Sequence, residues 1–163
     1  MQQQLLKLLP MLRRFAYSLT GSMADADDLV QSTIEKILSK GLPDEVELAK
    51  WAFRVCRNIW IDEYRARKVR LVAAQDPELQ EEQSMDSSAQ IDQKNTLNQV
   101  NAAMQALPDD QRSILALVAV QGFSYKEVSE SLDIPLGTVM SRLSRARTSL
   151  ITLIKGQQGG LVA

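Results

Sequence analysis

Arginine and hydroxyl side chains recur along residues 137–155, which contain four Lys or Arg residues and no acid. Guanidinium groups can pair with guanine edges, and hydroxyls can bond to phosphates. Val139, Leu143, Ala146 and Leu150 are spaced by 4, 3 and 4 residues, which predicts a helix with these side chains facing a core. The side chains left facing outward and able to contact DNA are Thr138, Ser141, Arg142 and Arg145.

A second basic segment covers residues 51–70, with six Lys or Arg against Asp62 and Glu63. Its period predicts a helix with a core stripe through Trp51, Val55 and Ile59. The other faces supply donors for phosphates or bases, namely Arg54, Arg57, Asn58, Arg65, Arg67 and Lys68. Asn58 could instead bond to Asp62 one turn later. For the aromatic side chains we favour core packing over base stacking; they are Phe53, Trp60 and Tyr64.

The basic helix near the C-terminus comes last in a helix-turn-helix pattern over residues 107–147. A largely apolar support helix begins near Asp109 and closes at Gly122. Ser124 and Glu127 then form an S-x-x-E capping box that starts a short helix. The turn Asp133-Ile134-Pro135 follows. In this motif the final helix enters the DNA major groove, so sequence reading is the expected role.

The N-terminal part has helical periodicity from Leu5 to Leu19, and Pro10 either starts a second helix or kinks a first one. A further helix begins after Gly21, with three aspartates in its first turn, where the helix dipole favours acids. These aspartates have no second cluster to complete a metal shell, so we expect no metal site. They form either a solvated turn or a partner-binding face.

An acidic segment, residues 71–93, separates the two basic parts, with six acids and no Lys or Arg. Its composition predicts a flexible linker; a polar helix from about Pro77 to Met85 is the alternative. We therefore expect an all-α fold of two small helical domains, with these boundaries: domains at 1–70 and 94–155, the linker at 71–93 and a short tail at 156–163. Extended, the linker spans roughly 75 Å, enough for two sites about two helical turns apart.

Charge and composition exclude several functions. The net charge of −1 hides an uneven distribution: 12 Lys or Arg against 9 acids over residues 1–70, and 7 against 5 over residues 94–163. The chain has no histidine, a single cysteine (Cys56) and no phosphate-binding loop motif, so we expect neither enzyme activity nor a cofactor. No apolar run approaches the ~20 residues of a membrane span, which favours a cytoplasmic protein without membrane insertion.

Three motifs in this order resemble one family. DADDLVQSTIEKIL resembles a core-polymerase-binding helix, and WAFRVCRNIWIDEYRARK resembles a promoter-melting, −10-reading helix. LPDDQRSILALVAVQGFSYKEVSESLDIPLGTVMSRLSRAR resembles a −35-reading domain. On these motifs the chain resembles the extracytoplasmic-function, group IV sigma factors of the sigma-70 superfamily.

The resemblance implies an alternative sigma factor that binds core RNA polymerase and promoter DNA and is controlled by an anti-sigma factor. It assigns polymerase binding to Asp28, Gln31, Ser32 and Glu35. It assigns the −10 region to Arg54, Arg57, Asn58, Arg65 and Lys68. It assigns the −35 element to Thr138, Ser141, Arg142 and Arg145, assisted by Tyr125 and Lys126.

The chain also departs from the family's pattern. Met140 and Ser144 stand where cations are frequent, which predicts fewer phosphate contacts and a shallower salt dependence. The loop at residues 41–50 is acidic where relatives often carry aromatic and basic residues. Two alternative functions are a sigma-like decoy, which would have lost its basic faces, and a free-standing regulator, which would leave the surface from Asp28 to Glu35 without a role.

Overall fold

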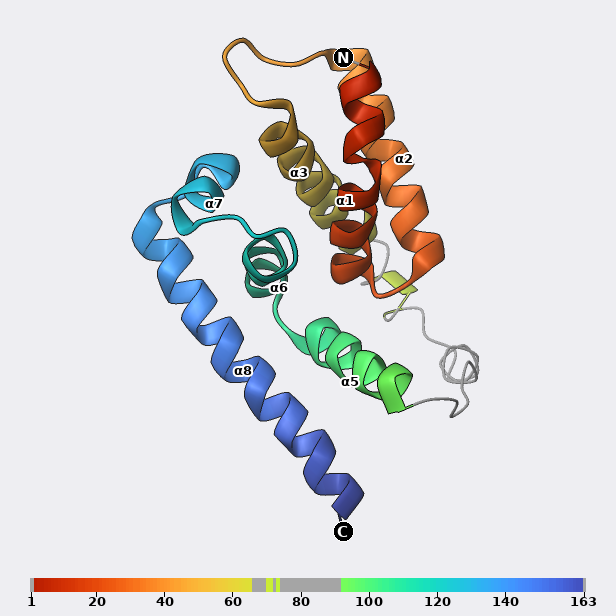
Figure 1. Cartoon of the computed structure of the whole chain (residues 1–163), viewed down its shortest axis with the longest axis vertical. Helices are drawn as coiled ribbons and strands as arrows, with labels where there is room; N and C mark the ends of the chain where they lie inside the picture. The colour runs from red at the N-terminus through yellow and green to blue at the C-terminus, as the bar shows by residue number, and fades with distance from the viewer. Residues whose placement is uncertain (1, 66–69, 72, 74–91, 163) are drawn as a thin grey trace.

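The computed structural model describes residues 2–65, 70, 71, 73 and 92–162, and within these ranges the regular structure is entirely helical (Figure 1). The elements are α1 (Gln2–Thr20), α2 (Met23–Lys40), α3 (Leu48–Ile59), the π-helical turn η1 (Trp60–Arg65), α5 (Asp92–Ala106), α6 (Asp109–Leu115), the π-helical turn η4 (Ala116–Val120), α7 (Tyr125–Leu132) and α8 (Leu136–Val162). The predicted all-α fold is confirmed. Most of the predicted linker, with the alternative polar helix, lies outside the described residues.

Helices α1 and α2 form an antiparallel pair joined by a tight turn (Figure 1). Pro10 lies inside a continuous α1, so the first segment is one helix rather than two. Gly21 has a φ of +74°, in the left-handed region that glycine adopts without strain. Ser22 then caps α2, because its Oγ accepts a hydrogen bond from the Asp25 backbone N–H at 3.4 Å.

Helix α3 starts earlier than the sequence pattern predicts, at Leu48, and gives way to the π-helical turn at Trp60. Aromatic side chains of α3 and of the π-helical turn pack into the core. Phe53 is fully buried and makes edge-to-face contacts with Phe15 and Phe123, both at 5.2 Å between ring centroids. Trp60 is also buried. Core packing is therefore confirmed for Phe53 and Trp60, whereas the side chain of Tyr64 lies outside the described residues.

The helix-turn-helix is built as its sequence predicts. Ser124 and Glu127 form both hydrogen bonds of a capping box at the start of α7. The bond from the Ser124 backbone N–H lowers the pKa of the Glu127 carboxyl. Asp133 ends α7 in the left-handed conformation, with φ 55° and ψ 52°. This residue reverses the chain into α8 and so sets the angle between the two helices.

Helix α5 is buried over only half of its length. Met104 and Leu107, in the second half of α5, are buried, but Leu97 is 68% exposed and Val100 is 37% exposed. The first half of α5 projects beyond the helices that cover its second half (Figure 1). The apolar period of α5 therefore continues past the surface that the other described helices cover.

The two helical parts pack on each other in a single body, and Arg112 lies at the centre of that contact. Its guanidinium donates hydrogen bonds to the backbone carbonyls of Leu19 at 2.8 Å, Gln105 at 2.7 Å and Leu107 at 2.9 Å. It also stacks 5.1 Å from the centroid of the Trp60 ring. Burial lowers the pKa of Arg112. One cation thus joins the C-terminal ends of α1 and α5, where helix dipoles favour positive charge.

A second contact joins α3 to α7. The Lys50 Nζ lies 3.3 Å from the Glu130 carboxylate, and the Ser131 hydroxyl donates to the Lys50 carbonyl at 3.0 Å. The hydrogen bond to Glu130 raises the pKa of Lys50. These contacts hold the start of α3 against α7 of the helix-turn-helix.

Candidate nucleic-acid interface

Helix α8 is anchored by the side chains that the sequence places inward. Val139 and Ala146 are fully buried and Leu143 is 1% exposed. Pro135 starts the helix, since its carbonyl accepts the backbone N–H groups of Thr138 and Val139. The predicted inward stripe is confirmed, and the opposite side of α8 is free to meet a ligand.

The residues predicted for the −35 element fall into two groups on this helix-turn-helix. Ser141, Arg145 and Lys126 are exposed. Tyr125, Thr138 and Arg142 are partly buried. Arg142 lies on the flank that faces the N-terminal part, where its Nη1 is 3.8 Å from the Asp110 carboxylate. The exposed group therefore presents itself to solvent, whereas Arg142 is engaged within the chain.

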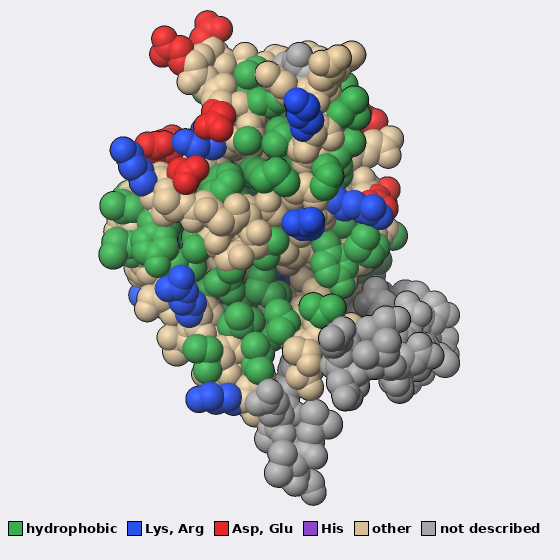
Figure 2. Space-filling view, viewed as in Figure 1, with side chains coloured by type: hydrophobic (Ala, Val, Ile, Leu, Met, Phe, Trp, Pro, Cys, Tyr) green, Lys and Arg blue, Asp and Glu red, His purple; other side chains and the backbone are tan. Residues whose placement is uncertain are grey.

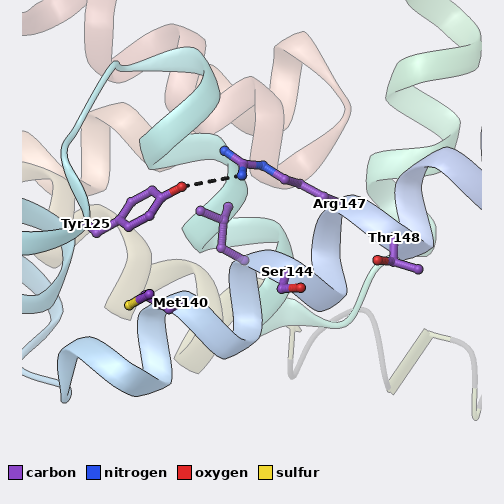
Figure 3. Close-up of a pocket in the computed structure, with 6 residues that line it drawn as sticks. Tyr125, Met140, Ser144, Arg147 and Thr148 are labelled. Atoms are coloured by element: carbon purple, nitrogen blue, oxygen red, sulfur yellow. Dashed lines mark hydrogen bonds between the residues drawn. The ribbon is translucent and has the colours of Figure 1, made fainter.

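On the other flank of α8 the structure brings together residues that the sequence left apart. A cavity of about 290 Å³ is lined by Tyr125, Met140, Leu143, Ser144, Arg147 and Thr148. Figure 3 shows how the labelled side chains lie along α8 and at the start of α7. The Arg147 Nη1 donates a hydrogen bond to the Tyr125 hydroxyl at 3.4 Å. Sequence reasoning missed Arg147 and Thr148. The spacing of 4 and then 3 residues from Met140 through Ser144 to Arg147 was the available signal, but only the fold brings Tyr125 beside them.

The residues predicted for the −10 region differ in exposure and in the contacts they make within the chain. Asn58 is exposed, and the Arg54 guanidinium lies over the Trp51 ring, 5.7 Å from its centroid. The Arg57 side chain is only 13% exposed and donates to the Asp110 carboxylate at 2.9 Å and the Ser113 hydroxyl at 3.0 Å. The side chain of Arg65 and all of Lys68 lie outside the described residues.

Asp110 therefore contacts one residue from each of the two groups predicted to bind DNA. One of its carboxylate oxygens meets Arg57 from α3 and the other meets Arg142 from α8. Burial lowers the pKa of Arg57, while Asp110 opposes that shift and Arg142 adds to it. The carboxylate partly neutralises two cations that would otherwise repel each other.

The side chains predicted to bind polymerase lie along one side of α2. Asp28, Gln31 and Glu35 are exposed and Ser32 is partly exposed. The Gln31 amide donates to the Glu35 carboxylate at 3.3 Å, which orders this surface. The opposite side of α2 packs into the core through Leu29, Val30, Thr33 and Ile37. The four polar side chains are thus available to a partner.

The chemistry of the single cysteine follows from its position in the fold. Cys56 is buried, and that burial raises the pKa of its thiol to about 12, so it is not a thiolate at neutral pH. Within the described ranges, no group of three His, Cys, Asp or Glu residues is placed to hold a metal ion. The helices described there include none long and apolar enough to cross a bilayer.

A capped helix-turn-helix, packed against a helical bundle with its own basic helix, defines a class of two-part helical DNA-binding protein. Family models agree with both parts: a Sigma-70 region 4 model matches residues 97–150, and a model of the Sigma2 domain of PhyR matches residues 5–55.

Relatives match over nearly the whole chain. An ECF RNA polymerase sigma factor, EcfG of Rhodopseudomonas palustris, is 32% identical over 156 residues, which cover 94% of this chain and 84% of that protein. RNA polymerase sigma factor SigZ of Bacillus subtilis is 32% identical over 134 residues, 80% of this chain and 73% of that one. The chain belongs to the ECF family of RNA polymerase sigma factors.

A solved structure extends this similarity to the relative placement of the helices. The sigma factor RpoE from Bartonella quintana, in complex with the anti-sigma factor NepR, matches with a TM-score of 0.72 and 30% identity. The match covers 94% of this chain and 96% of that one. CnrH, solved with the cytosolic domain of CnrY, has the same fold at 22% identity and a TM-score of 0.69.

Proposed function

We propose that this sigma factor reads the −35 element with α7 and α8, contacts the −10 region with α3, and binds core RNA polymerase with the exposed side of α2. The observation that carries the proposal is the acid-free α8, held with Ser141 and Arg145 facing solvent by a capped helix-turn-helix. This arrangement matches the groove-binding geometry of the motif. The cation and hydroxyls there supply the donors that base edges and phosphates require.

The proposal requires the two parts to separate. Arg57 and Arg142 both lie within 4 Å of the Asp110 carboxylate, whereas promoter elements two helical turns apart are separated by roughly 70 Å. While the two helical parts are packed together, an arrangement we call the closed body, α3 and α8 cannot contact both elements at once. A linker at residues 71–93 is long enough for that separation when extended, since 23 residues span roughly 75 Å.

We also propose control by an anti-sigma factor that holds the closed arrangement. RpoE of Bartonella quintana is described in complex with such a factor. This chain leaves apolar side chains uncovered on α5 and α8, among them Leu97, Val100 and Ile151. Figure 2 shows a broad apolar area on the face viewed, with Lys and Arg side chains standing singly around it. Such an area suits a protein partner rather than DNA.

Two further proposals concern the cellular location of the protein and whether it is an enzyme. A sigma factor acts where RNA polymerase and the chromosome are, so we propose a cytoplasmic location. We propose that the chain is a binding subunit and not an enzyme.

The test is run-off transcription from a genomic promoter library with purified core RNA polymerase, with and without this protein. Starts that appear only with the protein and share two upstream elements would support the proposal and supply the consensus. The Glu35→Arg variant should lose these starts, while Glu45→Arg, an exposed charge in the loop after α2, serves as a control for the charge change. Binding to neither polymerase nor DNA would favour the decoy alternative.

A further inference from the structure

We propose that the cavity between Tyr125 and Arg147 binds one phosphate of the DNA backbone next to the −35 element. The inference rests on the proposed role of α8 and adds a site to it. Neither Arg147 nor Thr148 is among the residues that the family resemblance assigns to DNA. The ligand class is a phosphodiester of duplex DNA, bound without regard to base identity.

The lining of the cavity has the chemistry of a phosphate site. It contains one guanidinium, on Arg147, and three hydroxyls, on Tyr125, Ser144 and Thr148, and no carboxylate. Arginine matches phosphate oxygens with its planar set of N–H donors, and hydroxyls add further donors. Met140 and Leu143 supply an apolar wall that suits the adjoining sugar carbons.

The size of the cavity fits this ligand. Its volume of about 290 Å³ corresponds to roughly ten waters, each occupying about 30 Å³ in the liquid. A phosphate group with part of a sugar fits within that space. Arg147 and Thr148 are exposed, so a duplex can reach the cavity without rearrangement of the core.

The position of the cavity also fits the docking geometry of the motif. Tyr125 is the first residue of α7, and Arg147 lies three turns along α8. In a helix-turn-helix the first helix crosses the DNA backbone while the start of the second reads base edges. A phosphate held between Tyr125 and Arg147 would fix the distance from which Ser141 and Arg145 approach the bases.

The hydrogen bond between Arg147 and Tyr125 explains why Arg147 suits the backbone better than a base. At 3.4 Å it draws the guanidinium toward α7 and away from the start of α8. The bond is long, so the guanidinium can turn its remaining donors to an incoming oxygen. The hydrogen bond to Tyr125 therefore restricts the orientation of the Arg147 guanidinium before DNA binds.

The first test measures binding of the full chain to two 20-base-pair duplexes as salt is varied. One duplex carries the −35 element found by transcript mapping, and the other has the same bases in scrambled order. Arg147→Ala should lower the salt slope by about 1 on both duplexes, so the loss of affinity should shrink about fourfold between 50 and 200 mM salt. Arg14→Ala removes an equally exposed arginine from α1 and should leave the slope unchanged. Equal slopes for Arg147→Ala and wild type would overturn the proposal.

The second test locates the phosphate. Single phosphates of the −35 duplex are replaced in turn by neutral methylphosphonates, and binding is measured for wild type, Tyr125→Phe and Arg147→Ala. At one position, the neutral methylphosphonate should weaken binding of wild type several-fold but should not weaken binding of Arg147→Ala any further. The loss for Tyr125→Phe at that position should lie between these two. Arg147→Ala losing as much as wild type at every position would contradict the site.

These outcomes are separate from the proposed function. If run-off transcription shows promoter-specific starts but Arg147→Ala binds both duplexes with the wild-type salt slope, the phosphate site alone is wrong. If no starts appear with the wild-type protein, the proposed function itself fails, and no −35 duplex is defined for the salt measurement. Circular dichroism of each variant excludes loss of helix as the cause of weaker binding.

Discussion

At the scale of single residues, the structure separates cations that the sequence treats alike. Arg145 is exposed, whereas Arg57 is largely buried against Asp110 and Ser113. Arg112, with no assigned role in the sequence, makes more hydrogen bonds within the chain than any of the predicted DNA contacts for which bonds are described. Position in the fold, rather than residue type, decides which arginines can meet a ligand.

Burial also determines the chemistry of Cys56, whose thiol pKa rises from 9.0 to about 12. The folded state therefore keeps a proton that the unfolded chain releases above pH 9. As pH rises from about 9 to about 12, the free energy of unfolding should fall by about 1.4 kcal/mol per pH unit from this group.

Urea unfolding at intervals across that pH range, on wild type and Cys56→Ser, measures the effect. Lysines and tyrosines titrate in both proteins, so the difference in slope isolates the thiol. Identical slopes for the two proteins would show that Cys56 is not protected in the folded state.

At the scale of elements, helix ends set the positions of the helices that are predicted to contact DNA. The capping box at Ser124 and the left-handed Asp133 define α7 and the turn into α8. Gly21 has a comparable role between α1 and α2, and it also approaches α5. A Cβ at Gly21 would lie 2.7 Å from the Gln105 side chain, which itself donates to the Ser18 carbonyl.

Gly21→Ala should lower the free energy of unfolding by roughly 1–3 kcal/mol, because its φ of +74° strains any residue with a Cβ. The clash with Gln105 adds to that cost by disturbing the contact between α1 and α5. Gly156→Ala is the matched control, since it lies in α8 with nothing within 4 Å of the added Cβ. Chemical denaturation checks both, and equal stability of Gly21→Ala and wild type would refute the strain.

At the scale of the whole molecule, the closed body packs together the two helical parts that carry α3 and α8, the helices predicted to contact DNA. Arg112 joins α1 to α5, Lys50 joins α3 to α7, and Asp110 holds Arg57 and Arg142. These polar contacts lie beside apolar packing, since Phe53 of α3 meets Phe123 at 5.2 Å, so separation of the two parts exposes both ion pairs and aromatic surface.

Asp110→Asn should favour separation, because the amide no longer balances the charges of Arg57 and Arg142. The ion pairs are partly exposed, so an effect of about 1 kcal/mol is expected, which is roughly fivefold tighter binding of the full chain to a −35 duplex. Fluorescence anisotropy measures this, with Asp44→Asn in the exposed loop as a control of equal charge change. Unchanged affinity for Asp110→Asn would show that this carboxylate does not restrain α8.

The sequence by itself determined the local structure. The capping box at Ser124, the turn at Asp133 and the inward stripe of α8 depend on neighbours a few residues away, which the chain order supplies. The all-α fold followed from the same periodicities. The π-helical turn at Trp60 and the exposure of Leu97 could not be predicted, because each depends on which surfaces of other helices are present to cover it.

Only the tertiary structure decided which polar groups meet. Asp110 lies 53 positions from Arg57, and Tyr125 lies 22 positions from Arg147. No periodicity links residues so far apart, and their pairing results from how α3, α6, α7 and α8 pack. A charged side chain has the same local signature whether it faces solvent or a distant partner, so the sequence predicted the family and the basic helices, while packing assigned each cation its neighbour.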